Sequence, residues 1–143
     1  LMGKLVNVFV LFDRARRQSS KISNKNHENY NDSNKLNKNI WKIIYFIHRN
    51  YHQDITLQEL SDKFSVSTAY LSTSFKKYLG ENFLSFLNDI RIKHACALLA
   101  SSEMQITDIA LDVGFNSYGS FSRVFRQKKD MNATEYRREQ LEE

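Results

Sequence analysis

The chain contains an internal repeat. Four apolar positions recur at an offset of 49 residues, and three further positions recur at an offset of 50. The matched residues are Leu57, Leu60, Phe64 and Val66 with Ile106, Ile109, Val113 and Phe115, followed by Leu71, Ser72 and Phe75 with Phe121, Ser122 and Phe125. Within each copy the apolar positions are spaced three or four apart on both sides of a short gap, which is typical of two helices joined by a tight turn. The repeat therefore predicts two helix-turn-helix units.

Composition and local signals agree with an all-α fold. The 143 residues include no proline and only four glycines, whereas sandwiches and barrels need a turn about every 8–12 residues. Thr56 and Glu59 have the spacing of a capping box at a helix start, Ser67 is placed to cap the following helix, and Gly80 is placed to end it. Gly114 falls in the second turn, where glycine adopts a positive φ at the least cost.

A long helix is predicted between the two units, from about Asn82 to Ala100. Its apolar residues form two bands, the first with Phe83, Phe86, Leu87, Ile90, Ala97 and Leu98 and the second with Ile92, Ala95 and Leu99. A helix with two apolar faces is usually packed between two units. We therefore expect Phe83 and Phe86 to be buried against the first unit, and Leu98 and Leu99 against the second.

The residues before the first unit divide into three segments. Residues 1–18 have apolar side chains at alternating spacings of four and three, which suits a helix packed on a partner, on another domain or on its own domain. Residues 19–37 are rich in Ser, Asn and Lys, and we expect a flexible linker there because few apolar anchors offset the entropy of ordering. From Lys38 a helix is predicted whose inner face holds Ile40, Ile43, Ile44, Ile47 and Tyr51.

Net charge alone does not establish a nucleic-acid partner. The chain has a formal charge of +5, but residues 1–36 hold 7 Lys and Arg against 3 Asp and Glu. The remaining residues hold 14 against 13, which leaves them close to neutral. Any DNA-binding role must therefore rest on where individual cations lie.

The sequence contains little that suggests catalysis, metal binding or a membrane. His48 and His52 have a spacing that can bind metal, but no third ligand accompanies them. Cys96 and His94 point to different sides of one helix, so they cannot act as a nucleophile and its base. The longest apolar stretch, residues 5–12, is far short of the ~20 residues that span a bilayer. We expect a cytoplasmic protein that is no enzyme and has no metal, no cofactor and no membrane contact.

The outer face of each second helix holds the candidate DNA contacts. In a helix-turn-helix unit the second helix enters the major groove, and only its outer side chains can read bases. Arg123 is the strongest candidate, because an arginine can donate two hydrogen bonds to one guanine. The predicted base-reading residues are Ala69, Tyr70, Ser72, Thr73, Tyr118, Gly119, Ser122 and Arg123. The predicted phosphate contacts are Ser67, Lys76, Lys77, Asn116, Ser117, Arg126, Gln127 and Lys128, although any single lysine among them is as readily explained by a solvated surface.

The second unit closely resembles the signature of the AraC/XylS transcription regulators. The similarity lies in the segments ITDIALDVGFNS (106–117) and FSRVF (121–125), with weaker similarity in residues 55–80 and in Arg91 and Ile92. It covers about residues 40–138. The resemblance implies an all-α DNA-binding domain over residues 38–143, with about seven helices and two helix-turn-helix units joined by a long central helix.

The same resemblance implies partners and a domain order. Double-stranded DNA is the expected partner, with the two recognition helices in successive major grooves, and RNA polymerase is a further expected partner. Residues 1–18 are expected to be a helix remnant of a preceding sensor or dimerisation domain, with 19–37 as the interdomain linker and a homodimer forming through the preceding domain. The alternative is a helical protein-interaction domain that does not bind DNA.

Three departures from the family pattern bear on these expectations. Thr73 stands where family members often have a larger or charged residue, and Gly119 replaces a common contact residue. Near the last helix Asp130 and Ala133 replace the usual glycine and proline. Because Asn132 can still pair with Glu135 in a capping box, we expect the last helix to form.

Overall fold

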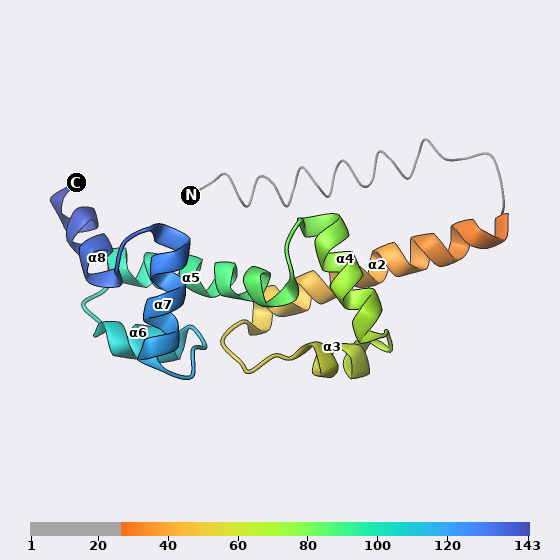
Figure 1. Ribbon diagram of the computed structural model, residues 1–143, viewed down its shortest axis with the longest axis horizontal. Coiled ribbons are helices and arrows are strands. Elements are labelled where there is room, and N and C mark those ends of the chain that lie inside the picture. The colour runs from red at the N-terminus through yellow and green to blue at the C-terminus, as the bar shows by residue number, and fades with distance from the viewer. Residues whose placement is uncertain (1–26) are drawn as a thin grey trace.

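The computed structural model describes residues 27–143. This part of the chain forms seven helices and no strands, which confirms the expected all-α class. The helices are α2 (His27–Asn50), α3 (Leu57–Phe64), α4 (Thr68–Leu79), α5 (Phe83–Ser101), α6 (Ile106–Asp112), α7 (Tyr118–Lys129) and α8 (Ala133–Glu142). Figure 1 shows α5 running along the long axis of the molecule, with α3 and α4 beside its start and α6, α7 and α8 beside its end.

The first unit packs α2, α3, α4 and the start of α5 around one apolar core. As predicted, the inner face of α2 is buried, and its members Ile40, Ile43, Ile44 and Ile47 are at most 4% exposed. Leu60 of α3 and the α4 residues Leu71 and Phe75 are fully buried against that face. Burying a side chain of this size contributes about 1.5–3 kcal/mol, so this core holds the first helix-turn-helix in place.

The second unit is built in the same way from the end of α5 with α6, α7 and α8. Ile109, Phe121 and Phe125 are fully buried in its core. Arg137 of α8 donates hydrogen bonds to the carbonyl oxygens of Leu99 (3.2 Å) and Ser102 (3.4 Å). These carbonyls lie at the end of α5, where no helical partner is available, so α8 closes the end of the central helix.

The two apolar faces of α5 pack on different cores, as predicted. Phe83, Phe86, Leu87 and Ile90 belong to the first core, and Ile92, Ala95, Cys96 and Leu99 belong to the second. Two details of the predicted bands are wrong: Ala97 is exposed, and Leu98 is only partly buried against the second core. The second unit packs on the side of α5 that holds Ala95, Cys96 and Leu99, so Ala97 faces solvent and Leu98 lies at the edge of this contact.

The sequence correctly placed most of the helix ends. Thr56, Ser67, Asn82 and Asn132 are N-caps whose side chains accept the backbone N–H three residues later. Asn132 and Glu135 form a full capping box, so α8 forms despite the departures from the family pattern. The expected positive φ is found at Gly80 (75°) and Gly114 (108°), and Asp130 adopts φ 57° at the end of α7.

The first described helix is longer than predicted. α2 begins at His27 rather than at Lys38, so the expected linker boundary at residue 37 does not coincide with a helix boundary. Residues 27–37 contain no proline or glycine to stop a helix, and each residue added to a formed helix gains a hydrogen bond without a new nucleation step. The expected helix over 1–18 and residues 19–26 of the expected linker lie outside the described residues.

Candidate DNA interface

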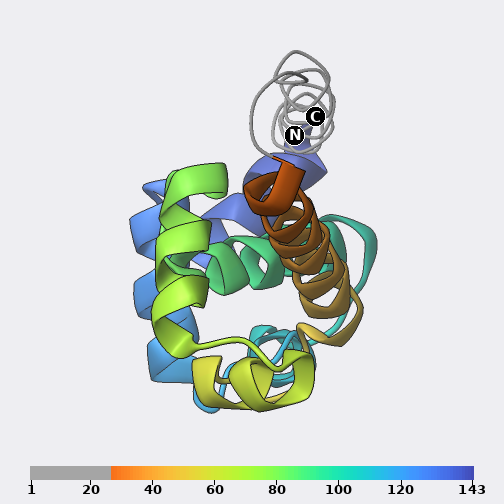
Figure 2. The same cartoon turned by 90° about the vertical axis from the view of Figure 1, so that its right-hand side faces the viewer.

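The two recognition helices, α4 and α7, lie on the same side of the molecule. Figure 2, viewed along the long axis, shows both at one edge of the fold, with α2 on the other side. In Figure 1 they stand one after the other along the long axis and run in the same direction. The arrangement therefore places the two equivalent helices on one surface of the molecule.

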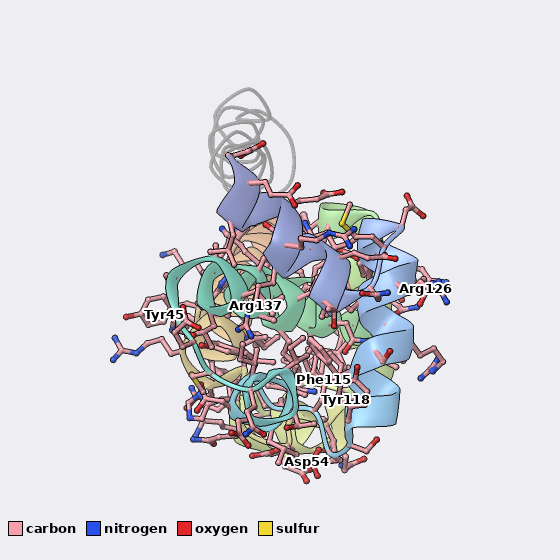
Figure 3. The ribbon with its side chains drawn as sticks, turned by 90° about the vertical axis from the view of Figure 1, so that its left-hand side faces the viewer. Tyr45, Asp54, Phe115, Tyr118, Arg126 and Arg137 are labelled. Atoms are coloured by element: carbon pink, nitrogen blue, oxygen red, sulfur yellow. The ribbon has the colours of Figure 1, made fainter. Side chains whose placement is uncertain are left out.

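Recognition helix α7 has the stronger set of exposed polar groups. Arg123, Arg126 and Gln127 are exposed, and Tyr118 is 47% exposed at the first position of the helix. Figure 3 shows Tyr118 at the start of α7 and Arg126 projecting outward near its end. Gly119 follows Tyr118 in the exposed first turn. Of the predicted base-reading residues here, only Ser122 is half-buried and so presents little surface.

Recognition helix α4 offers smaller groups. Ala69, Ser72 and Thr73 are exposed, and so are Lys76 and Lys77 in the last turn. These positions agree with the outward face predicted from the sequence.

Tyr70 differs from the sequence-based expectation. Its ring packs partly against the first core, and burial raises the pKa of its hydroxyl, while a hydrogen bond with Ser74 lowers it. The predicted outward position is therefore only partly correct, because the aromatic ring gains more by covering the core than by facing water.

Two of the predicted phosphate contacts are helix caps. The hydroxyl oxygen of Ser67 accepts the N–H of Tyr70 at 3.0 Å, and that of Ser117 accepts the N–H of Ser120 at 3.1 Å. These side chains hold the starts of α4 and α7, where free backbone N–H groups favour an anion. Asn116, just before Ser117, is exposed.

Lys128 is already paired within the protein. Its Nζ lies 2.9 Å from the Asp89 carboxylate and donates a hydrogen bond of 2.8 Å to the hydroxyl of Ser85, and both partners are on α5. Only 23% of the Lys128 side chain is exposed. The structure thus gives Lys128 a contact between helices, which sequence spacing did not indicate because the partners are about 40 residues apart.

Charge is divided unevenly between the helices. α4 contains two lysines, α7 contains two arginines and two lysines, and neither contains an acidic residue. Because residues 37–143 hold 14 basic and 13 acidic residues, the rest of that segment has eight basic against 13 acidic. The near-neutral total therefore conceals two cationic recognition helices on a net acidic scaffold. Counting charge helix by helix would have found this signal in the sequence.

The contacts that Arg91 makes were not predicted from the sequence. This α5 residue is 7% exposed, and its guanidinium donates hydrogen bonds of 2.8 Å to the carbonyl oxygens of Tyr51 and Gln53, in the loop between α2 and α3. It also lies over the ring of Phe115, 5.7 Å from its centroid, in the second unit. Burial lowers the pKa of Arg91, and the charge of Asp54 opposes that shift.

Other kinds of site are not indicated within residues 27–143. No three or more His, Cys, Asp and Glu side chains in this part of the chain gather as they would around a metal ion. Cys96 is buried, and burial raises the pKa of its thiol, which disfavours a reactive thiolate. None of the helices described is both long and apolar enough to span a membrane.

Comparisons with known proteins agree with this geometry. A family model described as a helix-turn-helix domain matches residues 60–139. An uncharacterized HTH-type transcriptional regulator of Staphylococcus aureus is 38% identical over 96 residues, which cover 67% of this chain and 13% of that protein. The chain thus spans only a small part of that relative.

Solved structures show the same fold. The C-terminal domain of AraT, a response regulator from Geobacillus stearothermophilus, matches with a TM-score of 0.68 and 33% identity, covering 70% of this chain and 84% of that domain. A transcriptional regulator with an AraC-type DNA-binding domain, from Chromobacterium violaceum, has a TM-score of 0.64 at 24% identity over 77% of this chain and 95% of that one, which supports the fold. The chain belongs to the AraC family of helix-turn-helix transcription regulators, whose shared domain binds DNA, and not to a family of enzymes.

Proposed function

We propose that this chain reads DNA by placing α4 and α7 in two successive major-groove segments on one face of a duplex. The observation that carries the proposal is the pair of recognition helices on one side of the molecule, both free of acidic residues. α5 has 19 residues and spans about 28 Å at ~1.5 Å per residue. This length approaches the ~34 Å of one DNA turn. A helix-turn-helix that docked only on another protein would not need this cationic pair, so DNA is favoured over the protein-interaction alternative.

The two recognition helices are proposed to contribute differently to base recognition. Arg123 and Tyr118 on α7 have the reach to contact base edges, whereas the α4 residues Ser72 and Thr73 suit close approach, water-mediated contacts or thymine methyl groups. Gly119 has open space where a Cβ would lie, with only the Ser117 hydroxyl at 4.0 Å, so the start of α7 can approach the groove closely. Specificity is therefore expected to come mainly from the second unit.

The phosphate contacts are proposed to fix the position of both helices without reading sequence. Four exposed residues suit this role. They lie near the C-terminal ends of the two helices, Lys76 and Lys77 on α4 and Arg126 and Gln127 on α7. The backbone N–H groups at the start of each recognition helix add an anion-binding end. Lys128 is left out of this set because it is paired with Asp89.

Two alanine variants test the division between base and phosphate contacts. A duplex selected by this protein from a random library, and a scrambled duplex, are bound at two salt concentrations. We expect Arg123→Ala to weaken binding to the selected duplex by about 1–3 kcal/mol and to relax preference at one base pair. Lys76→Ala should weaken binding to both duplexes and flatten the dependence on salt, because one fewer counterion is released.

The matched control is Arg49→Ala. Arg49 donates a hydrogen bond of 3.0 Å to the Tyr45 hydroxyl, and Figure 3 shows Tyr45 on the side opposite Arg126. This variant loses the same charge as Arg123→Ala, so a similar loss of affinity in both would show that only net charge matters. Equal weakening of selected and scrambled duplexes by Arg123→Ala would place Arg123 on a phosphate.

Two proposals concern further partners. RNA polymerase and a second copy of the regulator would be bound in addition to DNA, with dimerisation through residues that precede the DNA-binding domain, and the protein would act in the cytoplasm. These proposals rest on membership of the AraC family of transcription regulators. Sedimentation of the regulator at micromolar concentration and retention of polymerase on its duplex test the two partner proposals, and a monomer that retains no polymerase would reject both of these.

A further inference from the structure

The two helix-turn-helix units touch each other at two places in addition to being joined by α5. One contact surrounds Arg91 near the middle of α5, and the other joins Lys128 to the first half of α5. A single connecting helix would allow one unit to swing relative to the other about its flanking turns. The two contacts lie at opposite ends of α7, where they oppose such a motion.

The first contact centres on Arg91 and Gly114. Arg91 holds two carbonyl oxygens of the α2–α3 loop, at Tyr51 and Gln53. A Cβ added to Gly114 would lie 2.8 Å from the Arg91 Nε and 2.8 Å from the Tyr51 carbonyl oxygen. The turn that leads into α7 thus lies directly against the loop of the first unit. Tyr51 accordingly packs against both apolar cores.

The second contact lies at the other end of α7. Lys128, in the last turn, is held by Asp89 at 2.9 Å and by Ser85 at 2.8 Å, and the Ser85 hydroxyl in turn donates to Glu81 at 2.6 Å. This stretch of α5 is the part that packs on the first core. Because Lys128 and Asp89 are only 23% and 15% exposed, the pair is less screened than an ordinary surface ion pair.

We propose that these two contacts set the spacing between the DNA segments that the chain can bind at once, with Arg91, Gly114 and Lys128 as positioning residues. The contacts act at the two ends of α7, so together they determine its direction and its distance from α4. The inference rests on the proposed function, in which both helices bind one duplex. A duplex whose two segments have a different spacing would then have to distort or give up one helix.

The test compares binding to duplexes with altered spacing. The parent duplex is the one selected by the 143-residue chain. The other duplexes have one base pair added or removed between the two segments that the chain protects in a footprint of the parent duplex. One base pair moves the second segment by ~3.4 Å and turns it by about a tenth of a turn. The wild-type chain is expected to lose about ten-fold or more in affinity on each altered duplex.

Three variants loosen the contacts without removing an exposed cation from the recognition face. Arg91→Lys keeps the charge but cannot donate to two carbonyl oxygens in a fixed fork. Asp89→Asn and Lys128→Met each break the ion pair from one side. We expect all three to bind the parent duplex more weakly and to lose less than about three-fold on the altered duplexes. Lys128→Arg, which can pair with Asp89 again, should restore the wild-type discrimination.

Asp89→Asn separates positioning from phosphate binding. If Lys128 contacts phosphate instead, Lys128→Met weakens binding to every duplex and lowers the salt dependence, whereas Asp89→Asn frees a cation and strengthens binding. That pair of results, or a spacing profile unchanged in all three variants, would overturn the proposal. A wild-type footprint on a single groove segment would instead overturn the proposed function.

A measurement without DNA follows the contacts directly. Spin labels on Thr73→Cys and Gln127→Cys, in a Cys96→Ala background, report the distribution of distances between α4 and α7. The distribution is expected to be narrow in the otherwise unchanged chain and broader in Arg91→Lys and Lys128→Met. Equally narrow distributions in all proteins would show that α5 and the apolar cores alone hold the units in place.

Discussion

At the scale of residues, the glycines show how one residue type serves three purposes. Gly80 has a positive φ in open space, Gly114 has a positive φ in a crowded contact, and Gly119 lies in the regular first turn of α7. The sequence suggested the first two as a helix end and a turn. Gly114 also leaves space for Arg91 and Tyr51. The sequence did not predict this contact, because both residues lie far from Gly114 along the chain.

Substituting alanine at the three positions separates these purposes. Gly80→Ala should cost about 1 kcal/mol in the free energy of unfolding, because only the backbone conformation is penalised. Gly114→Ala should cost more, since its Cβ would also lie within 3 Å of backbone and buried guanidinium. Gly119→Ala should stabilise the chain by about 0.5–1 kcal/mol. Urea denaturation of the three variants measures this order, and an equal cost at Gly80 and Gly114 would contradict the crowded contact.

At the scale of elements, α5 links both halves of the fold. Its second apolar face was correctly placed in Ile92, Ala95 and Leu99, but periodicity alone could not tell Leu98 from Leu99, which lie 100° apart around the helix. The position of the packed unit decided which of them is fully buried. The start of α2 was missed for a related reason, because residues 27–37 have few apolar residues from which to predict a helix.

Leucine truncations on α5 test the assignment of its faces. Leu99→Ala should lower the free energy of unfolding by about 2–5 kcal/mol, because the side chain is only 1% exposed in the second core. Leu84→Ala, a matched change at a residue that is 61% exposed, should change it by less than about 0.5 kcal/mol. Leu98→Ala should fall between them. Denaturant melts of the three proteins check the order, and a larger loss at Leu98 than at Leu99 would mean that the helix faces are assigned wrongly.

At the scale of the whole molecule, a histidine-containing junction joins α2 to α5. The His48 ring meets Phe86 edge-on at 5.7 Å, and the His94 ring stacks on Tyr51 at 4.0 Å. Burial lowers the pKa of both histidines below 6.5, and the charge of Lys93 lowers both pKa values further. The charge of His94 also lowers the pKa of His48. The folded chain thus favours neutral rings at this junction.

Stability should consequently fall in mild acid. Below pH 6.5, the ordinary pKa of histidine, the unfolded chain binds more protons than the folded chain, so the free energy of unfolding decreases as pH falls toward the lowered pKa values. The stabilising contribution is fully present above that range. Urea melts between about pH 7.5 and 5.5 should show this slope, and His48→Gln together with His94→Gln should reduce it. An identical slope in the double variant would assign the effect to other groups.

Apart from the start of α2, the sequence alone determined the helices, most of their caps, the two repeated units and the family, because these depend on local periodicity and on residues three or four apart. It also placed Arg123, Lys76 and Lys77 on outward faces, which the structure confirms. Whether any of these residues touches a base or a phosphate stays a prediction. Local patterns could go no further, since a helix face can be predicted from a short segment and its partner cannot.

Only the tertiary structure decided how the two units are oriented and which side chains hold them. The sequence predicts Lys128 as a phosphate contact, whereas the structure pairs it with Asp89. Arg91 holds two carbonyl oxygens of the α2–α3 loop, which the sequence did not predict. The Tyr70 side chain packs partly against the first core because α4 lies on that core. Contacts between residues about 40 positions apart depend on how whole helices pack, and packing buries whichever side of a helix meets its neighbour. The spacing of the two recognition helices is therefore a property of the assembled molecule.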